Sequence, residues 1–151
     1  MENRIQVIIA DSNEEFCEHL KKTLEQSCGY EVTGVADDGA KAAELLAAKR
    51  PDVLVLDLML SKMDGIAVLK RARSLDKPPV ALVLTGFMTE YVGSMAASLG
   101  VQYFMTKPCN FDAVAERVQE IVAVERQMSA AHARRPEVNI EAMVTSIIHE
   151  I

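Results

Sequence analysis

Hydrophobic residues follow two alternating patterns along this chain. Short, nearly continuous apolar runs, such as IQVIIA at residues 5–10 and VLVLD at residues 53–57, are typical of strands that are covered on both faces. The segments between these runs carry apolar residues about four positions apart, as in Phe16, Leu20 and Leu24, which predicts amphipathic helices. The alternation repeats five times and therefore predicts five strand–helix units.

The predicted elements define the fold class. Strands are expected at residues 5–10, 31–36, 53–57, 80–84 and 101–105, and helices at residues 13–27, 38–49, 65–74, 89–99 and 111–126. Regular alternation of strands with helices predicts a parallel sheet with helices on both faces, joined by right-handed crossovers. We therefore expect an α/β fold with a doubly wound, five-stranded, flavodoxin-like sheet of strand order 2-1-3-4-5. Ligands of such sheets bind at the carboxyl ends of the strands.

The last part of the chain has a different character. Residues 127–138 are polar, lack apolar periodicity and predict a linker, which leaves residues 1–126 as the first domain. Residues 139–151 return to a helical pattern, with Asn139 as the expected N-cap. Their apolar stripe needs a partner, which is the first domain, a second copy of the chain or further helices of a second domain. The stripe consists of Ile140, Met143, Val144, Ile147, Ile148 and Ile151.

Composition narrows the environment and the partners. The 151 residues carry a net charge of -6, so the chain is a poor candidate for holding nucleic acid by itself. Three cysteines are widely spaced without a CxxC pair, which is typical of free thiols in a reducing cytosol. No run reaches the roughly 20 apolar residues that a membrane span needs, and no signal peptide is recognisable. We expect a cytoplasmic protein.

Polar residues follow four of the predicted strands at their carboxyl ends. Asp11 and Ser12 follow the first strand, Asp57 ends the third, Thr85 follows the fourth and Lys107 follows the fifth. Each residue alone is commonplace, because a strand-end Asp is often a helix cap and a single Lys is usually a surface charge. Together they suit phosphoryl transfer: a carboxylate nucleophile, oxygen ligands for Mg²⁺, a lysine for the phosphoryl charge and a mobile hydroxyl.

At these positions the chain resembles the receiver domains of two-component response regulators. The matching motifs are IIADSN at 8–13, VLVLDLMLSKMDG at 53–65, VLTG at 83–86 and YFMTKP at 103–108. The resemblance covers about residues 5–125 and implies a signalling domain rather than an enzyme.

The resemblance also implies a role for each site residue. Asp57 would accept the phosphoryl group, Lys107 would bind it and Thr85 would be the switch hydroxyl. The implied Mg²⁺ ligands are Asp11, Asp57, the backbone carbonyl of Met59 and, with a neutral side chain, Ser12. Phe104 matches an aromatic switch residue, with a half-buried strand aromatic as the alternative, and a cis Lys107–Pro108 bond is expected.

The end of the chain resembles a different module. VTSIIHEI at 144–151 is similar to the opening of the DNA-binding effector domain of sporulation transcription factors, and PDVLVLD and YFMTKP resemble the receivers of the same proteins. By this resemblance, residues 139–151 are the first helix of a truncated effector domain. The implied partners are an upstream histidine kinase or phosphotransferase, the chain's own effector domain and a second copy of the chain. DNA would be contacted only through the missing effector domain.

Three departures from the family pattern leave an alternative open. Ser12 replaces a second acid, which should weaken Mg²⁺ binding and also lower the repulsion of an incoming phosphoryl group. Ser61 stands where many relatives have proline, and Cys109-Asn110 replaces an aromatic and an acid. The alternative is a degenerate receiver that acts through protein contacts without phosphorylation, although the joint presence of Asp57, Thr85 and Lys107 argues against it. A flavin carrier is disfavoured because the first strand–helix turn lacks a Gly-rich or Ser/Thr-rich phosphate loop.

The resemblance also indicates an output surface. In receivers, the face formed by the fourth helix, fifth strand and fifth helix commonly carries dimerisation. In this chain that face is expected to include Tyr91, Met95, Tyr103 and Val114, with the alternative that some of these residues are core or scattered surface apolars. We expect weak dimerisation that strengthens on phosphorylation.

Overall fold

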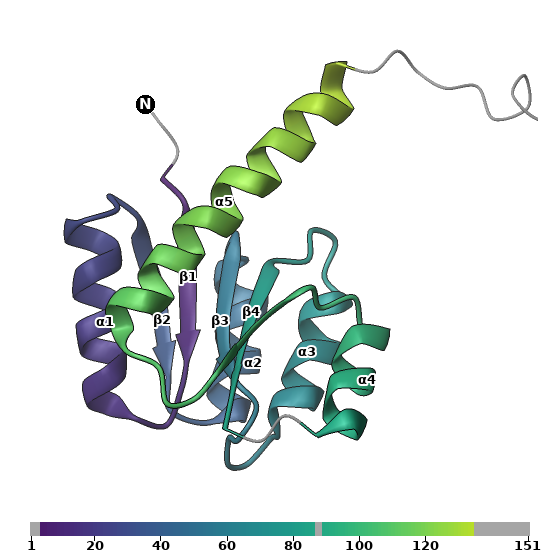
Figure 1. Cartoon of the computed structure of the whole chain (residues 1–151). Coiled ribbons are helices and arrows are strands. Elements are labelled where there is room, and N and C mark those ends of the chain that lie inside the picture. Colours follow the sequence, from purple (N-terminus) through teal and green to yellow (C-terminus); the bar gives the residue numbers. More distant parts are fainter. Residues whose placement is uncertain (1–3, 87–88, 135–151) are drawn as a thin grey trace, which may run out of the picture. The chain divides into compact units, whose positions relative to one another are not determined.

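The computed structural model describes residues 4–86 and 89–134. Strands and helices alternate through this part of the chain (Figure 1). In chain order the elements are β1 (Gln6–Ala10), α1 (Glu14–Gln26), β2 (Glu31–Ala36), α2 (Gly39–Lys49), β3 (Val53–Asp57), α3 (Gly65–Arg73), β4 (Val80–Thr85), α4 (Glu90–Ser98), β5 (Tyr103–Thr106) and α5 (Phe111–Arg134). The predicted helix at residues 139–151, with its N-cap Asn139, lies outside the described residues.

The chain divides into two units, Met1–Val118 and Gln119–Ile151. The first unit contains the whole sheet and the start of α5. Of the second unit, residues 119–134 are described, and they continue α5. The division into receiver, linker and effector helix that the sequence suggests stays a prediction.

The sheet has the predicted topology. Its order is β2-β1-β3-β4-β5, and every neighbouring pair is parallel. β1 and β3 are central, and their apolar residues from Val7 to Ala10 and from Val53 to Leu56 are buried. Strands buried on both faces have no need of polar alternation, which explains why these segments are apolar throughout.

Helices cover both faces of this sheet. On one face, Leu54 and Leu56 of β3 pack in a single core with Leu46 of α2, Leu69 of α3 and Ala96 of α4. The alternate strand residues point to the opposite face, as the pleat of a strand requires. Ile9 and Val55 on that face are fully buried, as are Leu20 and Leu24 of α1.

Side-chain caps determine where the helices begin. Asn13, Asp38, Asp64 and Thr89 each accept a hydrogen bond from the backbone N–H three residues further on. Asn110 does the same for Ala113 at 2.7 Å, directly before α5 begins. These caps satisfy N–H groups that have no partner inside the helix and so end each loop at the carboxyl edge of the sheet.

Two predicted boundaries were wrong. The fifth helix was predicted to end at residue 126, but α5 continues to Arg134. Residues 127–134, the described part of the predicted linker, are therefore helical. QMSAAHAR contains neither Gly nor Pro and has three alanines, and it keeps a helical backbone without apolar periodicity. β5 begins at Tyr103 rather than at residue 101, because Val101 donates its backbone N–H to Ala96 at the end of α4.

No helix in the described part of the chain combines the length and apolar character of a membrane span. Cys17, Cys28 and Cys109 are all free thiols, as their spacing suggested, and Cys17 is buried.

Candidate functional site

The four predicted strand ends meet at one edge of the sheet. Asp57 is the last residue of β3 and Thr85 the last of β4, while Asp11 and Lys107 directly follow β1 and β5. The parallel register brings these ends level, with Ala10 beside Leu56 and Asp57 beside Leu84. Asp11, Asp57 and Thr85 are the three buried polar or charged residues in the described part of the chain.

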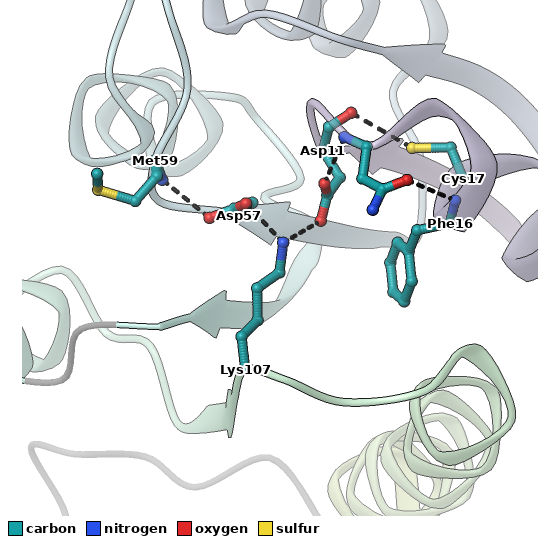
Figure 2. Close-up of polar contacts among 7 residues, drawn as sticks. Asp11, Phe16, Cys17, Asp57, Met59 and Lys107 are labelled. Carbon is teal, nitrogen blue, oxygen red and sulfur yellow. Dashed lines mark hydrogen bonds and ion pairs between the residues drawn. The ribbon is translucent and has the colours of Figure 1, made fainter.

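Lys107 connects the two carboxylates. Its Nζ atom donates hydrogen bonds of 2.7 Å to Oδ2 of Asp11 and 2.7 Å to Oδ2 of Asp57. Figure 2 shows the side chain extending from the end of β5 to a point between the two carboxylates. The lysine side chain is 26% exposed, whereas those of Asp11 and Asp57 are 1% and 6% exposed. A buried carboxylate needs such a partner, since an uncompensated charge in the interior is costly.

Backbone donors hold the other oxygen of each carboxylate. The N–H of Asn13 donates to Oδ1 of Asp11 at 2.9 Å, and the N–H of Met59 donates to Oδ1 of Asp57 at the same distance (Figure 2). Both bonds span two residues, which is the Asx-turn geometry that Asp favours at a chain reversal. All four carboxylate oxygens therefore accept a hydrogen bond from an N–H group.

The pKa of Lys107 reflects this arrangement. Burial by itself would lower the pKa of the ammonium, because it disfavours the charged form. The hydrogen bonds and negative charges of Asp11 and Asp57 outweigh burial and raise the pKa above its usual value. Lys107 is thus a permanently charged group at neutral pH.

The backbone around Lys107 fixes its direction. Its N–H donates to the carbonyl oxygen of Thr85 at 2.9 Å, which extends the pairing of β4 and β5 by one residue. The Lys107–Pro108 peptide bond is cis, as the resemblance to receiver domains implied. The ring of Phe16, on α1, lies 5.8 Å from Nζ and provides a cation–π contact.

Thr85 and Phe104 occupy neighbouring strands. Thr85 is 1% exposed and pairs in register with Thr106, while Phe104 pairs with Val83, two residues earlier on β4. Phe104 is partly buried and packs against the core formed with α2, α3 and α4. This is the environment that either a half-buried strand aromatic or a switch residue would have.

The loop after Asp57 is attached to the start of α2. Ser61 accepts a hydrogen bond of 3.0 Å from the N–H of Gly39, and Nζ of Lys62 lies 3.3 Å from Asp38. A Cβ atom at Gly39 would overlap the carbonyl oxygen of Met63, so only glycine allows this close approach. These contacts anchor the loop that begins with the Met59 N–H.

A groove of about 400 Å³ lies between α3 and α4 beside the site. Thr85 and Met59 line its end near Asp57, and Ile66, Tyr91 and Met95 line its walls. Tyr91 is 71% exposed, in agreement with its expected place on an output surface. Val114 instead follows the core alternative: it is fully buried on the first turn of α5 and is not part of an exposed output surface.

The acidic pocket suits Mg²⁺ to a limited extent. Mg²⁺ is usually held by one or two carboxylates together with carbonyls, waters and substrate phosphates, and Asp11, Asp57 and the carbonyl of Met59 belong to those classes. Ser12 is exposed, and the side chain of Asn13 is engaged in capping α1. In the described residues, no group of three or more His, Cys, Asp or Glu side chains is placed to hold a metal ion. The pocket therefore offers a cation only two carboxylates, Asp11 and Asp57, together with the Met59 carbonyl.

Some contacts of the site were not predicted from the sequence. The thiol of Cys17 donates to the carbonyl oxygen of Asp11 at 3.3 Å, and the backbone N–H of Asn13 binds the Asp11 side chain (Figure 2). Asn13 could be found as a helix cap from its position before an amphipathic segment. The contacts of Cys17, Phe16 and Gly39 have no local sequence signal, because their partners come from other elements or depend on the exact loop path.

Comparison with known proteins agrees with this arrangement. A family model described as the response regulator receiver domain matches residues 7–119. The signal receiver domain of the response regulator NarL from Mycobacterium tuberculosis is 29% identical, with a TM-score of 0.71 over 80% of this chain and 97% of that one. The receiver domain of AraT from Geobacillus stearothermophilus is 29% identical, with a TM-score of 0.69 over 82% and 99%. A CheY-like receiver domain protein from Methanospirillum hungatei JF-1, 20% identical, shares the fold with a TM-score of 0.76 over 83% and 99%.

Proposed function

The chain belongs to the response regulator receiver domain family of two-component systems, and from this premise we propose that it is switched by a phosphoryl group on Asp57. The observation that carries the proposal is the contact of 2.7 Å between Lys107 and a buried carboxylate at the end of the central strand β3. In this contact the Asp57 carboxylate, the proposed nucleophile, lies beside the Lys107 ammonium, whose positive charge would stabilise the phosphoryl oxygens.

The reaction needs little from the protein beyond position and charge. A carboxylate oxygen of Asp57 attacks the phosphorus atom of the donor, the P–O or P–N bond to the leaving group breaks, and the leaving group departs with the electron pair. The Met59 N–H orients the Asp57 carboxylate, and Lys107 balances charge on the transferred group. Asp11, Asp57 and the Met59 carbonyl would hold Mg²⁺, which when bound neutralises further phosphoryl charge.

Thr85 and Phe104 are proposed to transmit the change. Thr85 ends β4 next to the groove between α3 and α4, so its hydroxyl can turn toward a phosphoryl group on Asp57. Such a turn empties space beside β5, which Phe104 would occupy by changing its side-chain rotamer. A local change of this kind alters the α4 surface without altering the core.

The proposed partners follow from the family and from the end of the chain. The phosphoryl donor is an upstream histidine kinase or phosphotransferase, and the output passes to an effector domain whose first helix is residues 139–151. The similarity of residues 144–151, PDVLVLD and YFMTKP to sporulation regulators supports a sporulation-type transcription factor in the cytoplasm. DNA would be bound by the effector domain, and the receiver is a signalling domain rather than an enzyme.

The test is the intact mass of the chain after incubation with acetyl phosphate. We expect the wild type to gain one phosphoryl group, sensitive to hydroxylamine as an acyl phosphate is, and Asp57→Asn to gain none. Asp52→Asn is the matched control, because Asp52 lies at the opposite end of β3 and is exposed. No gain in the wild type with acetyl phosphate or a phosphorylated phosphotransferase would instead favour an interaction module that acts without phosphorylation.

Dimerisation is tested separately. Beryllofluoride stands in for the phosphoryl group on Asp57, so sedimentation velocity with and without it measures the effect of activation on mass. We expect a larger dimer fraction with beryllofluoride, and Tyr91→Ala should reduce it because Tyr91 is exposed on α4. An unchanged monomer mass would refute the dimerisation proposal.

A further inference from the structure

The acidic pocket already contains a cation that belongs to the protein. The Lys107 ammonium bridges Asp11 and Asp57 at equal distances of 2.7 Å, while backbone N–H groups occupy the other oxygen of each carboxylate. A divalent cation that binds the same oxygens must displace or share these hydrogen bonds. Binding a metal therefore competes with contacts that the folded protein has already made.

The charge of the pocket is also low for a divalent site. Two carboxylates and one ammonium leave a single net negative charge. Ser12, directly after Asp11, contributes no charge, and its exposed position opens to solvent at the start of α1. Among the described residues, no further acid completes a group of three with Asp11 and Asp57, and Asp38 caps α2 and pairs with Lys62. Affinity for hard cations follows the number of charged ligands, so this pocket is one carboxylate short.

We propose that Ser12 makes this receiver site depend on Lys107 rather than on a divalent cation: Lys107 is the resident bridge between Asp11 and Asp57, and divalent cations bind weakly unless a third carboxylate is present at position 12. Asp11 is then a positioning residue that holds the lysine beside Asp57. The inference concerns the regulation of the site in the proposed function, and its first test does not require phosphorylation.

The first test measures Mn²⁺ binding to the full chain by the electron paramagnetic resonance signal of free Mn²⁺. Ser12→Asp and Ser12→Asn are nearly equal in size and differ in charge. We expect the wild type and Ser12→Asn to bind weakly and alike, and Ser12→Asp to bind about tenfold or more tightly, because it adds a charged oxygen ligand beside Asp11. Equal affinity of the wild type and Ser12→Asp would overturn the inference. So would much tighter binding by the wild type than by Ser12→Asn, which would make the Ser12 hydroxyl a ligand.

The second test examines the bridge. If Lys107 competes with a divalent cation, Lys107→Gln should bind Mn²⁺ more tightly than the wild type, with Lys62→Gln as the control on an exposed lysine. Circular dichroism establishes that each variant is folded, and the pair of Ser12 variants decides the matter if Lys107→Gln is not. Unchanged or weaker Mn²⁺ binding by folded Lys107→Gln would contradict the role of the lysine.

The third test links the site to phosphorylation. The phosphoryl yield with acetyl phosphate should depend only weakly on Mg²⁺ in the wild type and steeply in Ser12→Asp. An equally steep dependence in both proteins would overturn the inference. If the Mn²⁺ affinities follow the expected order but neither protein gains a phosphoryl group, the proposed function fails while the inference about the cation stands.

Discussion

The ammonium of Lys107 lies 2.7 Å from an oxygen of Asp57, although 50 residues separate them in the sequence. Asp57 ends β3 and Lys107 directly follows β5, and β4 lies between these two strands in the parallel sheet. Lys107 neutralises a carboxylate that is otherwise buried, so the contact contributes both to folding and to the chemistry of the site.

Removing the ammonium should destabilise the protein. Lys107→Met leaves Asp11 and Asp57 buried without their shared counter-ion, and we expect the free energy of unfolding at neutral pH to fall by about 1–3 kcal/mol, less than for a fully buried pair because Lys107 is partly exposed. Urea unfolding followed by circular dichroism measures the change. Lys62→Met removes an exposed ion pair with Asp38 and should have little effect. An equal loss in both variants would show that the Lys107 bridge has no special role in stability.

The same contact predicts how stability changes at alkaline pH. Burial lowers the pKa of Lys107, but the hydrogen bonds and charges of Asp11 and Asp57 raise it by more, so the net pKa in the folded protein is above the usual value. Its contribution to stability is therefore complete below the unfolded pKa of about 10.4 and is lost as the pH rises through the higher folded value. We expect the difference in urea midpoint between the wild type and Lys107→Met to be constant from about pH 8 to 9.5 and to shrink above about pH 10.5. A difference that grows with pH over that range would contradict this sign.

Close packing at Gly39 predicts a strong effect of a single methyl group. Gly39→Ala forces a Cβ atom against the carbonyl of Met63 in the loop that orients Asp57, and should reduce the free energy of unfolding by about 1–3 kcal/mol. Gly86→Ala is the control, because the nearest atom to its Cβ would be Cβ of Lys107 at 3.9 Å, an ordinary contact. Thermal unfolding of both variants tests the comparison. Equal midpoints would mean that the loop moves away from α2 at little cost.

The thiol of Cys17 should be unreactive in the folded protein. Burial, followed by the negative charge of Asp11, raises its pKa to about 12, and its side chain donates to the Asp11 carbonyl. At about pH 8 its thiolate fraction is then roughly 1000-fold lower than for a free thiol of pKa 9.0. Peptide mass mapping after iodoacetamide treatment should find Cys28 and Cys109 alkylated before Cys17, and all three at similar rates in denaturing urea. Early alkylation of Cys17 in the native protein would refute its burial.

The sequence allowed the site to be predicted better than the contacts within it. Asp11, Asp57, Thr85 and Lys107 each follow or end an apolar run, and a parallel sheet brings such positions to one edge. Three contacts could not be predicted in this way. They are the Lys107 bridge between the carboxylates, the hydrogen bond from the Cys17 thiol to the Asp11 carbonyl, and the close approach of Gly39 to Met63. Each depends on a distance of a few ångströms that local sequence patterns do not specify.

The sequence by itself determined the order and type of the elements, because strand and helix periodicities and capping residues act over a few neighbouring positions. It left the end of α5 undecided, since the residues after Gln127 lack apolar periodicity but have helical propensity. Only the tertiary structure decided that Val114 is buried rather than exposed, and that a lysine joins the two carboxylates. Burial and charge pairing arise from atoms that are far apart along the chain, and they become definite only when the sheet and its helices are packed together.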